Sequence, residues 1–442
     1  MASRLFLTSL AIILSFEAGI IYLHNQEWKS AVGRPNLASF EWVEFWGGAG
    51  WDTAKAVASR RGAVFVSGTT TSYGSGKSDI FLLKYSDDGA LVWNVTWGGQ
   101  SYDGCWATAV DDEGIYVAGF TYVGGGQEAK LASFTFNGES AHANVALLKY
   151  DFEGDLQWVR SWGGEDDVVA RGVAVDGWGF VYVSGYIRGT ETTEESFLLK
   201  YDRTGDLVWS RRFGEEGLYA LGVDVDDFVY IGGTSEFAYG NLWKSETFLM
   251  KFDRDGNLLW DRRWGSSLLN YCWSIHLSGG QVYMAGTTMI NAGNDDAALL
   301  DYSSDGSLRF NKTWGGPEEE YSWGATCLND YVYVVGHMYE SSKPDCDVFM
   351  VKYSGDGAVL WNVTWGSRLA DIARSVAVEE SNVYVAGITY GQGEDGQVFL
   401  LKYNSANEVS SLEMDILSTA SIALGILALM VSILEILRER YV

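Results

Sequence analysis

Hydrophobic and polar positions alternate along short stretches of the chain, and these stretches recur in groups of four. In one copy, β-branched and aromatic residues mark strands over 91–97, 107–110, 115–118 and 145–150. Alternation over a few residues is typical of strands with one buried face. A tight polar turn such as Asp87-Asp88-Gly89 joins the third and fourth strands of a group, and glycine accepts the positive φ of such turns. The pattern predicts a repeated four-stranded unit.

Two markers recur with nearly constant spacing. Trp-Gly-Gly or a variant starts at Trp46, Trp97, Trp162, Phe213, Trp264, Trp314 and Trp365, and Lys-Tyr or a variant starts at Lys84, Lys149, Lys200, Lys251, Asp301, Lys352 and Lys402. The first Trp-Gly-Gly has no Lys-Tyr before it and the last Lys-Tyr has no Trp-Gly-Gly after it, so the two partial copies complete one another. A solenoid would need capping repeats instead. We therefore predict an all-β, seven-bladed β-propeller over residues 40–404, closed by pairing of its N-terminal and C-terminal strands.

Tryptophans and small residues occupy fixed places in the repeat. Tryptophans four residues before the Trp-Gly-Gly marker lie on the same strand face as the marker, at Trp42, Trp93, Trp158, Trp209, Trp260 and Trp361. Large rings at a fixed place in every sheet fill the gap between radial blades, so we interpret these six as structural docking residues. Crowding near the axis explains a column of small residues on the innermost strand: Ala56, Ala107, Gly172, Gly222, Ser274, Gly324 and Ser375.

The repeat resembles two known families. Trp97-Gly98-Gly99, Ala109-Val110-Asp111 and Ile115-Tyr116-Val117-Ala118-Gly119 are similar to the prokaryotic seven-bladed β-propeller repeat, and the likeness covers about residues 40–404. That family implies secreted or surface proteins. Gly89 to Trp93 also resembles the tryptophan-docking repeats of quinoprotein-like propellers, which would imply a quinone cofactor. The adjacent cysteine pair typical of those dehydrogenases is absent from this sequence, so we expect no cofactor.

Apolar segments lie at both ends of the chain. Residues 416–434 carry no charge and would extend about 28 Å as a helix, close to the hydrocarbon thickness of a bilayer. We expect a transmembrane helix at 416–437 and a cytoplasmic tail at 438–442, because arginines follow the apolar run. Residues 1–24 predict a signal anchor or signal peptide. Two hydrophobic helices would thus flank the propeller through linkers at 25–39 and 405–415; buried core helices are the alternative.

The predicted topology gives the propeller an orientation. The first strand of the propeller begins near residue 40, and the last strand ends near residue 403. Both of these ends lie on the same face, so both tethers leave from that side. The opposite face would point away from the membrane, outside the cytoplasm, and would carry longer loops at 122–143 and 234–246. Variable loops on a rigid scaffold are where binding usually resides.

The chain of 442 residues has a net charge of −27, which excludes a basic nucleic-acid binder. Acidic residues recur after the Trp-Gly-Gly markers, at Asp52, Asp103, Asp167, Glu216, Glu320 and Asp371. They would form a ring that binds a cation or a basic ligand, but turn chemistry is the interpretation we favour, since Asp readily bonds loop backbone. His337 and Trp243 are the further candidates for the ligand face.

Other chemistry is sparse. Four histidines stand at no metal-ligand spacing, so we expect no metal site, and the four cysteines are expected to be unpaired thiols. No catalytic residue can be assigned from a motif. Sequons at Asn94, Asn311 and Asn362 share one place on the outermost strand and are candidate N-glycosylation sites.

These observations favour a binding, interaction or cell-surface structural module, anchored in the cell membrane, with an extracellular protein or glycan as partner. The alternative is a carbohydrate-active enzyme, a hydrolase or lyase, that uses carboxylates on the loop face. A signalling receptor is a third hypothesis, and with five residues after Leu437 its signal would need a partner within the membrane.

Overall fold

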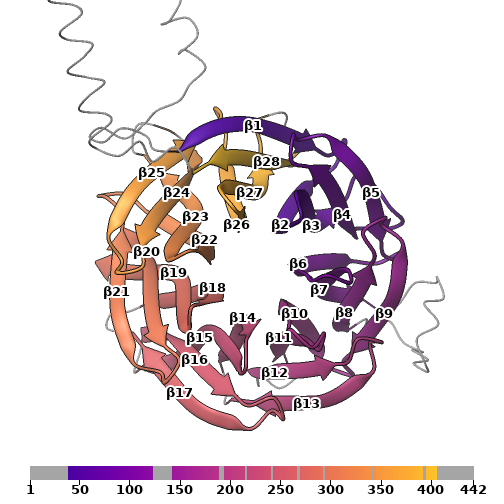
Figure 1. Cartoon of the computed structure of the whole chain (residues 1–442), viewed down its shortest axis with the longest axis horizontal. Helices are drawn as coiled ribbons and strands as arrows, with labels where there is room; N and C mark the ends of the chain where they lie inside the picture. Colours follow the sequence, from indigo (N-terminus) through magenta and orange to yellow (C-terminus); the bar gives the residue numbers. More distant parts are fainter. Residues whose placement is uncertain are drawn as a thin grey trace, which may run out of the picture.

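Seven four-stranded antiparallel sheets stand around a central axis (Figure 1). The structure, a computed structural model, describes residues 38–122, 142–188, 194–214, 217–239, 242–265, 269–291, 294–340, 343, 345–391 and 395–405. The sequence prediction of a seven-bladed β-propeller with four-stranded blades is confirmed.

Each blade contains four strands, ordered from the axis to the rim. The innermost strands are β2 (Asp52–Arg60), β6 (Asp103–Val110), β10 (Asp167–Val175), β14 (Leu218–Val225), β18 (Asn270–Ser278), β22 (Glu320–Leu328) and β26 (Asp371–Glu379). The second strands are β3 (Ala63–Thr70), β7 (Ile115–Tyr122), β11 (Val181–Arg188), β15 (Val229–Tyr239), β19 (Gln281–Asn291), β23 (Tyr331–Tyr339) and β27 (Asn382–Thr389). The third strands are β4 (Asp79–Ser86), β8 (Ala143–Tyr150), β12 (Glu194–Tyr201), β16 (Leu242–Phe252), β20 (Asn294–Ser303), β24 (Cys346–Ser354) and β28 (Gln397–Asn404). The rim strands are β5 (Leu91–Trp97), β9 (Leu156–Trp162), β13 (Leu207–Phe213), β17 (Leu258–Trp264), β21 (Leu308–Trp314), β25 (Val359–Trp365) and β1 (Ser39–Trp46).

The last blade combines strands from the two ends of the propeller. Strand β1 pairs antiparallel with β28, from Ser39 opposite Asn404 to Trp46 opposite Val398. The start of β1 and the end of β28 therefore lie together, on the face that carries the short turns within each blade. We call this side the turn face, and we call the opposite side, where the chain passes from blade to blade, the loop face.

An extra residue interrupts the pairing of every innermost strand. The register shifts between Cys105 and Ala107 in β6, and the same shift occurs in β2, β10, β14, β18, β22 and β26. Glycine lies opposite each of these β-bulges on the second strand. A Cβ atom at Gly119, for example, would overlap the carbonyl oxygen of Gly104. The column of glycines thus lets the innermost strand approach closely, and the bulge turns one side chain out of the regular pleat.

Neighbouring blades are joined by aromatic packing and by hydrogen bonds from two kinds of donor, a tryptophan indole and a lysine ammonium group. The indole of Trp46 packs on Phe81 of the next blade, with ring centroids 4.6 Å apart. The carbonyl oxygen of Phe152 accepts hydrogen bonds from Trp93 Nε1 (3.2 Å) and Lys84 Nζ (2.8 Å) of the preceding blade. These contacts give the recurring Trp and Lys a role at this junction between blades.

The closing blade is joined to the first blade in the same way. Trp42 Nε1 donates to the carbonyl oxygen of Asp87 at 3.2 Å, and Lys402 Nζ lies 2.7 Å from Asp87 Oδ1. Residue 42 comes from the N-terminal strand and residue 402 from the C-terminal strand. Strands from both ends of the propeller therefore close the ring.

Two sequence expectations on elements need correction. The sequence pattern predicts a loop at 234–246, but β15 and β16 continue to pair as far as Tyr239 opposite Leu242. A hairpin can carry polar residues beyond the core because its backbone hydrogen bonds need no buried side chain. The innermost strand of the second copy starts at Asp103 rather than at residue 107.

The expected hydrophobic helices at 1–24 and 416–437 lie outside the described residues. Within the described ranges, no helix is long and apolar enough to cross a membrane.

Candidate functional site

The bulge residues of the innermost strands are mostly cationic or aromatic. In blade order they are Lys55, Trp106, Arg171, Leu221, Trp273, Trp323 and Arg374. Figure 1 shows the seven innermost strands that carry them arranged around the central axis. We call the three cations and three tryptophans of this ring the axial cluster.

Trp106 lies between two cations from the neighbouring blades. The Nζ atom of Lys55 is 4.6 Å from the centre of the Trp106 ring, and the guanidinium carbon of Arg171 is 3.6 Å from it. Lys55 Nζ also lies 5.7 Å from the ring of Trp51, at the loop-face end of the same innermost strand. Such contacts stabilise a cation that has lost part of its water shell.

A row of aromatic rings forms another part of the cluster. Trp273 and Trp323 have centroids 4.9 Å apart, and the guanidinium of Arg374 lies 4.2 Å from the Trp323 ring. Trp323 Nε1 donates a hydrogen bond of 2.9 Å to Nδ1 of His337. This acceptor role requires a neutral imidazole, and burial, reinforced by Arg374, lowers the pKa of His337 to about 3.

The three cations also act on one another. Burial lowers the pKa of Lys55 to about 7, and the positive charges of Arg374 and Arg171 contribute to this shift. Burial lowers the pKa of Arg171 to about 10, with a smaller contribution from Arg374. Arg171 and Arg374 therefore influence one another although their blades are not neighbours in the ring.

No carboxylate compensates this charge among the described residues. None of the ion pairs within the described ranges involves Lys55, Arg171 or Arg374. The Nε atom of Arg374 is buried and has no hydrogen-bond acceptor in the part of the chain that the structure describes. A buried donor without an acceptor is costly to the folded state.

The acidic residues predicted from the sequence lie at the loop face, where five of the six are described. Asp52 Oδ2 accepts a hydrogen bond of 2.9 Å from the amide of Gly48, and Asp103 Oδ2 accepts one of 2.8 Å from Gly99. Asp371 and Glu320 accept from main-chain amides of their own turns in the same way. These are the bonds that turn chemistry predicts. Asp167 differs because its Oδ1 accepts from the amide of Ala143, and Glu216 lies outside the described residues.

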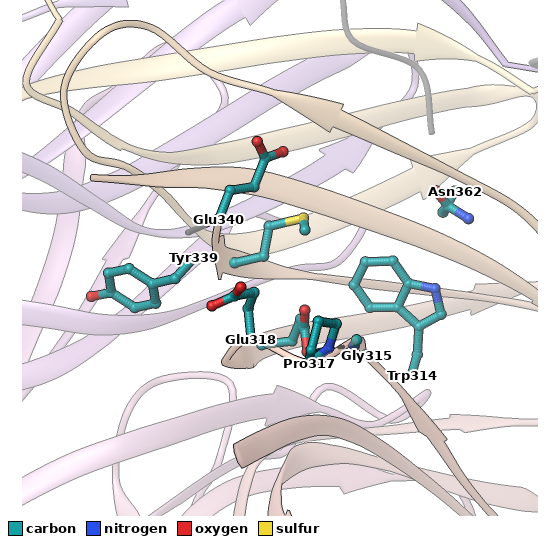
Figure 2. A pocket seen from close by; sticks show the side chains of 10 residues that line it. Trp314, Gly315, Pro317, Glu318, Tyr339, Glu340 and Asn362 are labelled. Carbon is teal, nitrogen blue, oxygen red and sulfur yellow. Dashed lines mark hydrogen bonds between the residues drawn. The ribbon is translucent and has the colours of Figure 1, made fainter. Parts of the chain in front are cut away.

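Glu320 borders a pocket of about 800 Å³ on the loop face. Figure 2 shows Trp314 and Asn362 at one end of this pocket and Glu318, Tyr339 and Glu340 at the other. Burial raises the pKa of Glu320 to about 7, and Asp296 and Glu318 add to the shift. The pocket is therefore lined by several carboxyl groups, one of which holds its proton near neutrality.

The remaining candidates are dispersed. His337 belongs to the aromatic row described above, and Trp243 lies in β16 with its side chain outside the described part of the structure. The three sequon asparagines lie on rim strands, where Asn94 and Asn311 are exposed and Asn362 lines the pocket. All four cysteines are buried and unpaired.

Sequence reasoning found the small residues next to the axis but missed the axial cluster. Each cluster residue precedes a member of the small column by one position, as Lys55 precedes Ala56. A regular strand would direct that neighbour to the opposite face. The glycine column on the second strand was the available signal for the bulge.

The fold defines the protein as a seven-bladed β-propeller, and comparisons with known proteins assign it to no established family. No protein-family model matches the chain. A segment covering 32% of the chain is 29% identical over 167 residues to the regulatory protein FlaEY of Caulobacter vibrioides, and it spans 18% of that protein's length.

Solved structures with a similar fold have little sequence identity to this chain. The WD40 β-propeller domain of Doa1 has a TM-score of 0.48 at 10% identity, with 84% of this chain and 100% of that chain covered. The polysaccharide lyase Uly1 has a TM-score of 0.45 at 12% identity, with 86% and 93% covered. A protein of unknown function from Dyadobacter fermentans has a TM-score of 0.46 at 10% identity, with 84% and 100% covered.

Proposed function

We propose that this protein is a membrane-tethered, extracytoplasmic binding module that holds an anionic ligand at the axial cluster. The observation that carries the proposal is the set of three cations, Lys55, Arg171 and Arg374, which lie on bulges of the innermost strands with no carboxylate partner among the described residues. Like charges gathered in a partly buried place lower stability, and an anion would relieve that repulsion.

The tryptophans narrow the chemistry of the ligand. Trp106, Trp273 and Trp323 supply flat apolar surface beside the cations, and such surface favours ligands that present a flat or apolar part next to the charge. Arginine suits carboxylate, sulfate and phosphate because its fork of donors matches their oxygens. The ligand would therefore combine an oxyanion with a flat apolar portion.

The tether is supported by the position of the chain ends. Ser39 and Asn404 pair with each other on the turn face, so segments that continue from them start on one side. An uncharged segment at 416–434 follows a short linker. With both tethers on the turn face, the loop face would be directed away from the bilayer.

Benzoate and benzamide, which share a ring and differ in charge, provide the test. Isothermal titration of the full chain in detergent should show benzoate binding in the millimolar range, with benzamide binding at least about tenfold more weakly. The double variant R171Q/R374Q should lose benzoate binding. Arg211→Gln, which changes a rim arginine bonded to the Gly256 carbonyl, should keep it. Equal binding of the two probes, or no binding of benzoate, would contradict the proposal.

A second candidate function has one observation in its favour. A carbohydrate-active enzyme needs a carboxyl group that is protonated near neutral pH as general acid, beside an ionised carboxylate. Glu320, with its pKa raised to about 7, meets the first requirement in the pocket of Figure 2. Release of reducing sugar or unsaturated product from a panel of polysaccharides, abolished in Glu320→Gln, would establish this activity.

A further inference from the structure

We propose that Lys55 forms a reversible imine with the carbonyl group of an anionic carbonyl compound, such as a 2-oxo acid, bound at the axial cluster. This inference rests on the proposed function, because the anionic group would be held by the two arginines of the cluster. It adds a covalent step to the binding of an anion.

The surroundings of Lys55 differ from those of the repeat lysines. Lys84, Lys200 and Lys251 each donate from Nζ to a main-chain carbonyl of the next blade, at 2.8, 3.0 and 2.8 Å. Lys55 has no hydrogen bond and no ion pair among the described residues, and its described contacts are with the rings of Trp51 and Trp106. Its amine therefore donates no hydrogen bond to the described part of the scaffold and contacts only the two rings.

The charges around Lys55 favour the nucleophilic form of the amine. With a pKa of about 7, roughly half of the amine is neutral at pH 7, whereas an ordinary lysine is almost fully protonated. Burial is the largest cause, Arg374 and Arg171 add to it, and the thiol of Cys105 acts in the opposite direction. Burial also raises the pKa of Cys105 to about 11, so that this thiol stays uncharged near neutral pH. A desolvated lysine beside other cations is an established way to activate an amine for imine formation.

In the proposed step each cation has a role. The carboxylate of a 2-oxo acid would bind to Arg171 or Arg374, and its adjacent carbonyl carbon would face Lys55. The nitrogen lone pair then forms the carbon–nitrogen bond, and the two amine hydrogens leave with the carbonyl oxygen as water. The step needs no oxidant, reductant or co-reactant, and water reverses it.

Reductive trapping tests the inference on the full chain. Incubation with pyruvate and cyanoborohydride, followed by peptide mapping, should place the adduct on Lys55 at least about tenfold above the exposed Lys77. The rate should rise with pH and level off above about pH 7. In R171Q/R374Q the adduct on Lys55 should fall to the level of Lys77, and in Lys55→Met the peptide carries none.

The outcomes separate the two proposals. If benzoate binds as expected but wild-type Lys55 is trapped no faster than Lys77, the imine is wrong while the anion site stands. If Lys55 is trapped selectively and the double variant traps equally well, the arginines do not hold the carboxylate, and the proposed imine mechanism is overturned. The wild-type comparison needs no variant to fold.

Discussion

At the scale of single residues, the carboxyl groups of the loop face are the clearest pH-sensitive feature. Glu320 accepts a hydrogen bond from the amide of Gly316, yet burial raises its pKa to about 7. The native state therefore holds this proton more tightly than the unfolded chain does. Between about pH 4.5 and 7 the native state holds the Glu320 proton that the unfolded chain has lost, so the contribution of Glu320 to stability falls as pH rises through that window.

The variant Glu320→Gln should remove this penalty. A Gln cannot ionise and can still accept from the Gly316 amide, so we expect it to stabilise the fold by about 2 kcal/mol at pH 8 and to have little effect at pH 4. Urea unfolding of the full chain at both pH values measures the difference. Glu318→Gln, which removes a charge from the same pocket, is the control. An unchanged stability at pH 8 would show that Glu320 is not held protonated.

At the scale of elements, the β-bulge decides where the axial side chains lie. Its sequence signal is indirect, because a bulge is a shift in pairing between two strands and not a property of one strand's pattern. Alternation and repeats therefore predicted the four-stranded repeat, the blade number and the closing pair. The axial cluster could not be found in that way, since regular alternation directs Lys55 and Ala56 to opposite faces.

The extension of β15 and β16 was missed for a related reason. Residues 234–246 contain polar residues and glycine in the manner of a loop, and their pairing depends on backbone hydrogen bonds that leave little hydrophobic pattern. The acidic residues after Trp-Gly-Gly can be read from the sequence. Their hydrogen-bond partners depend on how each turn folds back on its own carboxylate, which composition does not reveal.

Replacing a glycine opposite a bulge should destabilise the blade. In Gly119→Ala the new methyl group would overlap the Gly104 carbonyl, and we expect a loss of about 1–3 kcal/mol of unfolding free energy. Thermal and urea unfolding followed by tryptophan fluorescence measures it. Gly177→Ala is the matched control, because nothing lies within 4 Å of a Cβ atom there. Equal stability of the two variants would mean that the close approach of the strands is not required.

At the scale of the whole molecule, the side chains of the axial cluster carry a charge opposite in sign to the net charge of the chain. A chain with a net charge of −27 places three cations on its innermost strands, where none of the described ion pairs neutralises them. Anionic ligands would be repelled at the periphery and attracted at the axis. Such an arrangement favours selection of compact anions over large polyanions.

The proposed tether predicts which face lies near a bilayer. Single cysteines in Ser75→Cys on the loop face and Glu153→Cys on the turn face can be labelled with a fluorescent donor, because the four native thiols are buried. In vesicles containing an acceptor lipid, energy transfer should be stronger from residue 153 than from residue 75. Stronger transfer from residue 75 would reverse the proposed orientation, and no transfer from either would argue against membrane attachment.

The proposed anion site can be tested by anomalous diffraction from crystals of the full chain soaked in bromide. Bromide scatters anomalously and carries one negative charge, so we expect a peak on the axis, within contact distance of Arg171, Arg374 or Lys55. Crystals of R171Q/R374Q should lack that peak while retaining surface sites. An empty axis in the wild type beside occupied surface sites, or a carboxylate of the chain itself bonded to the arginines, would contradict the account.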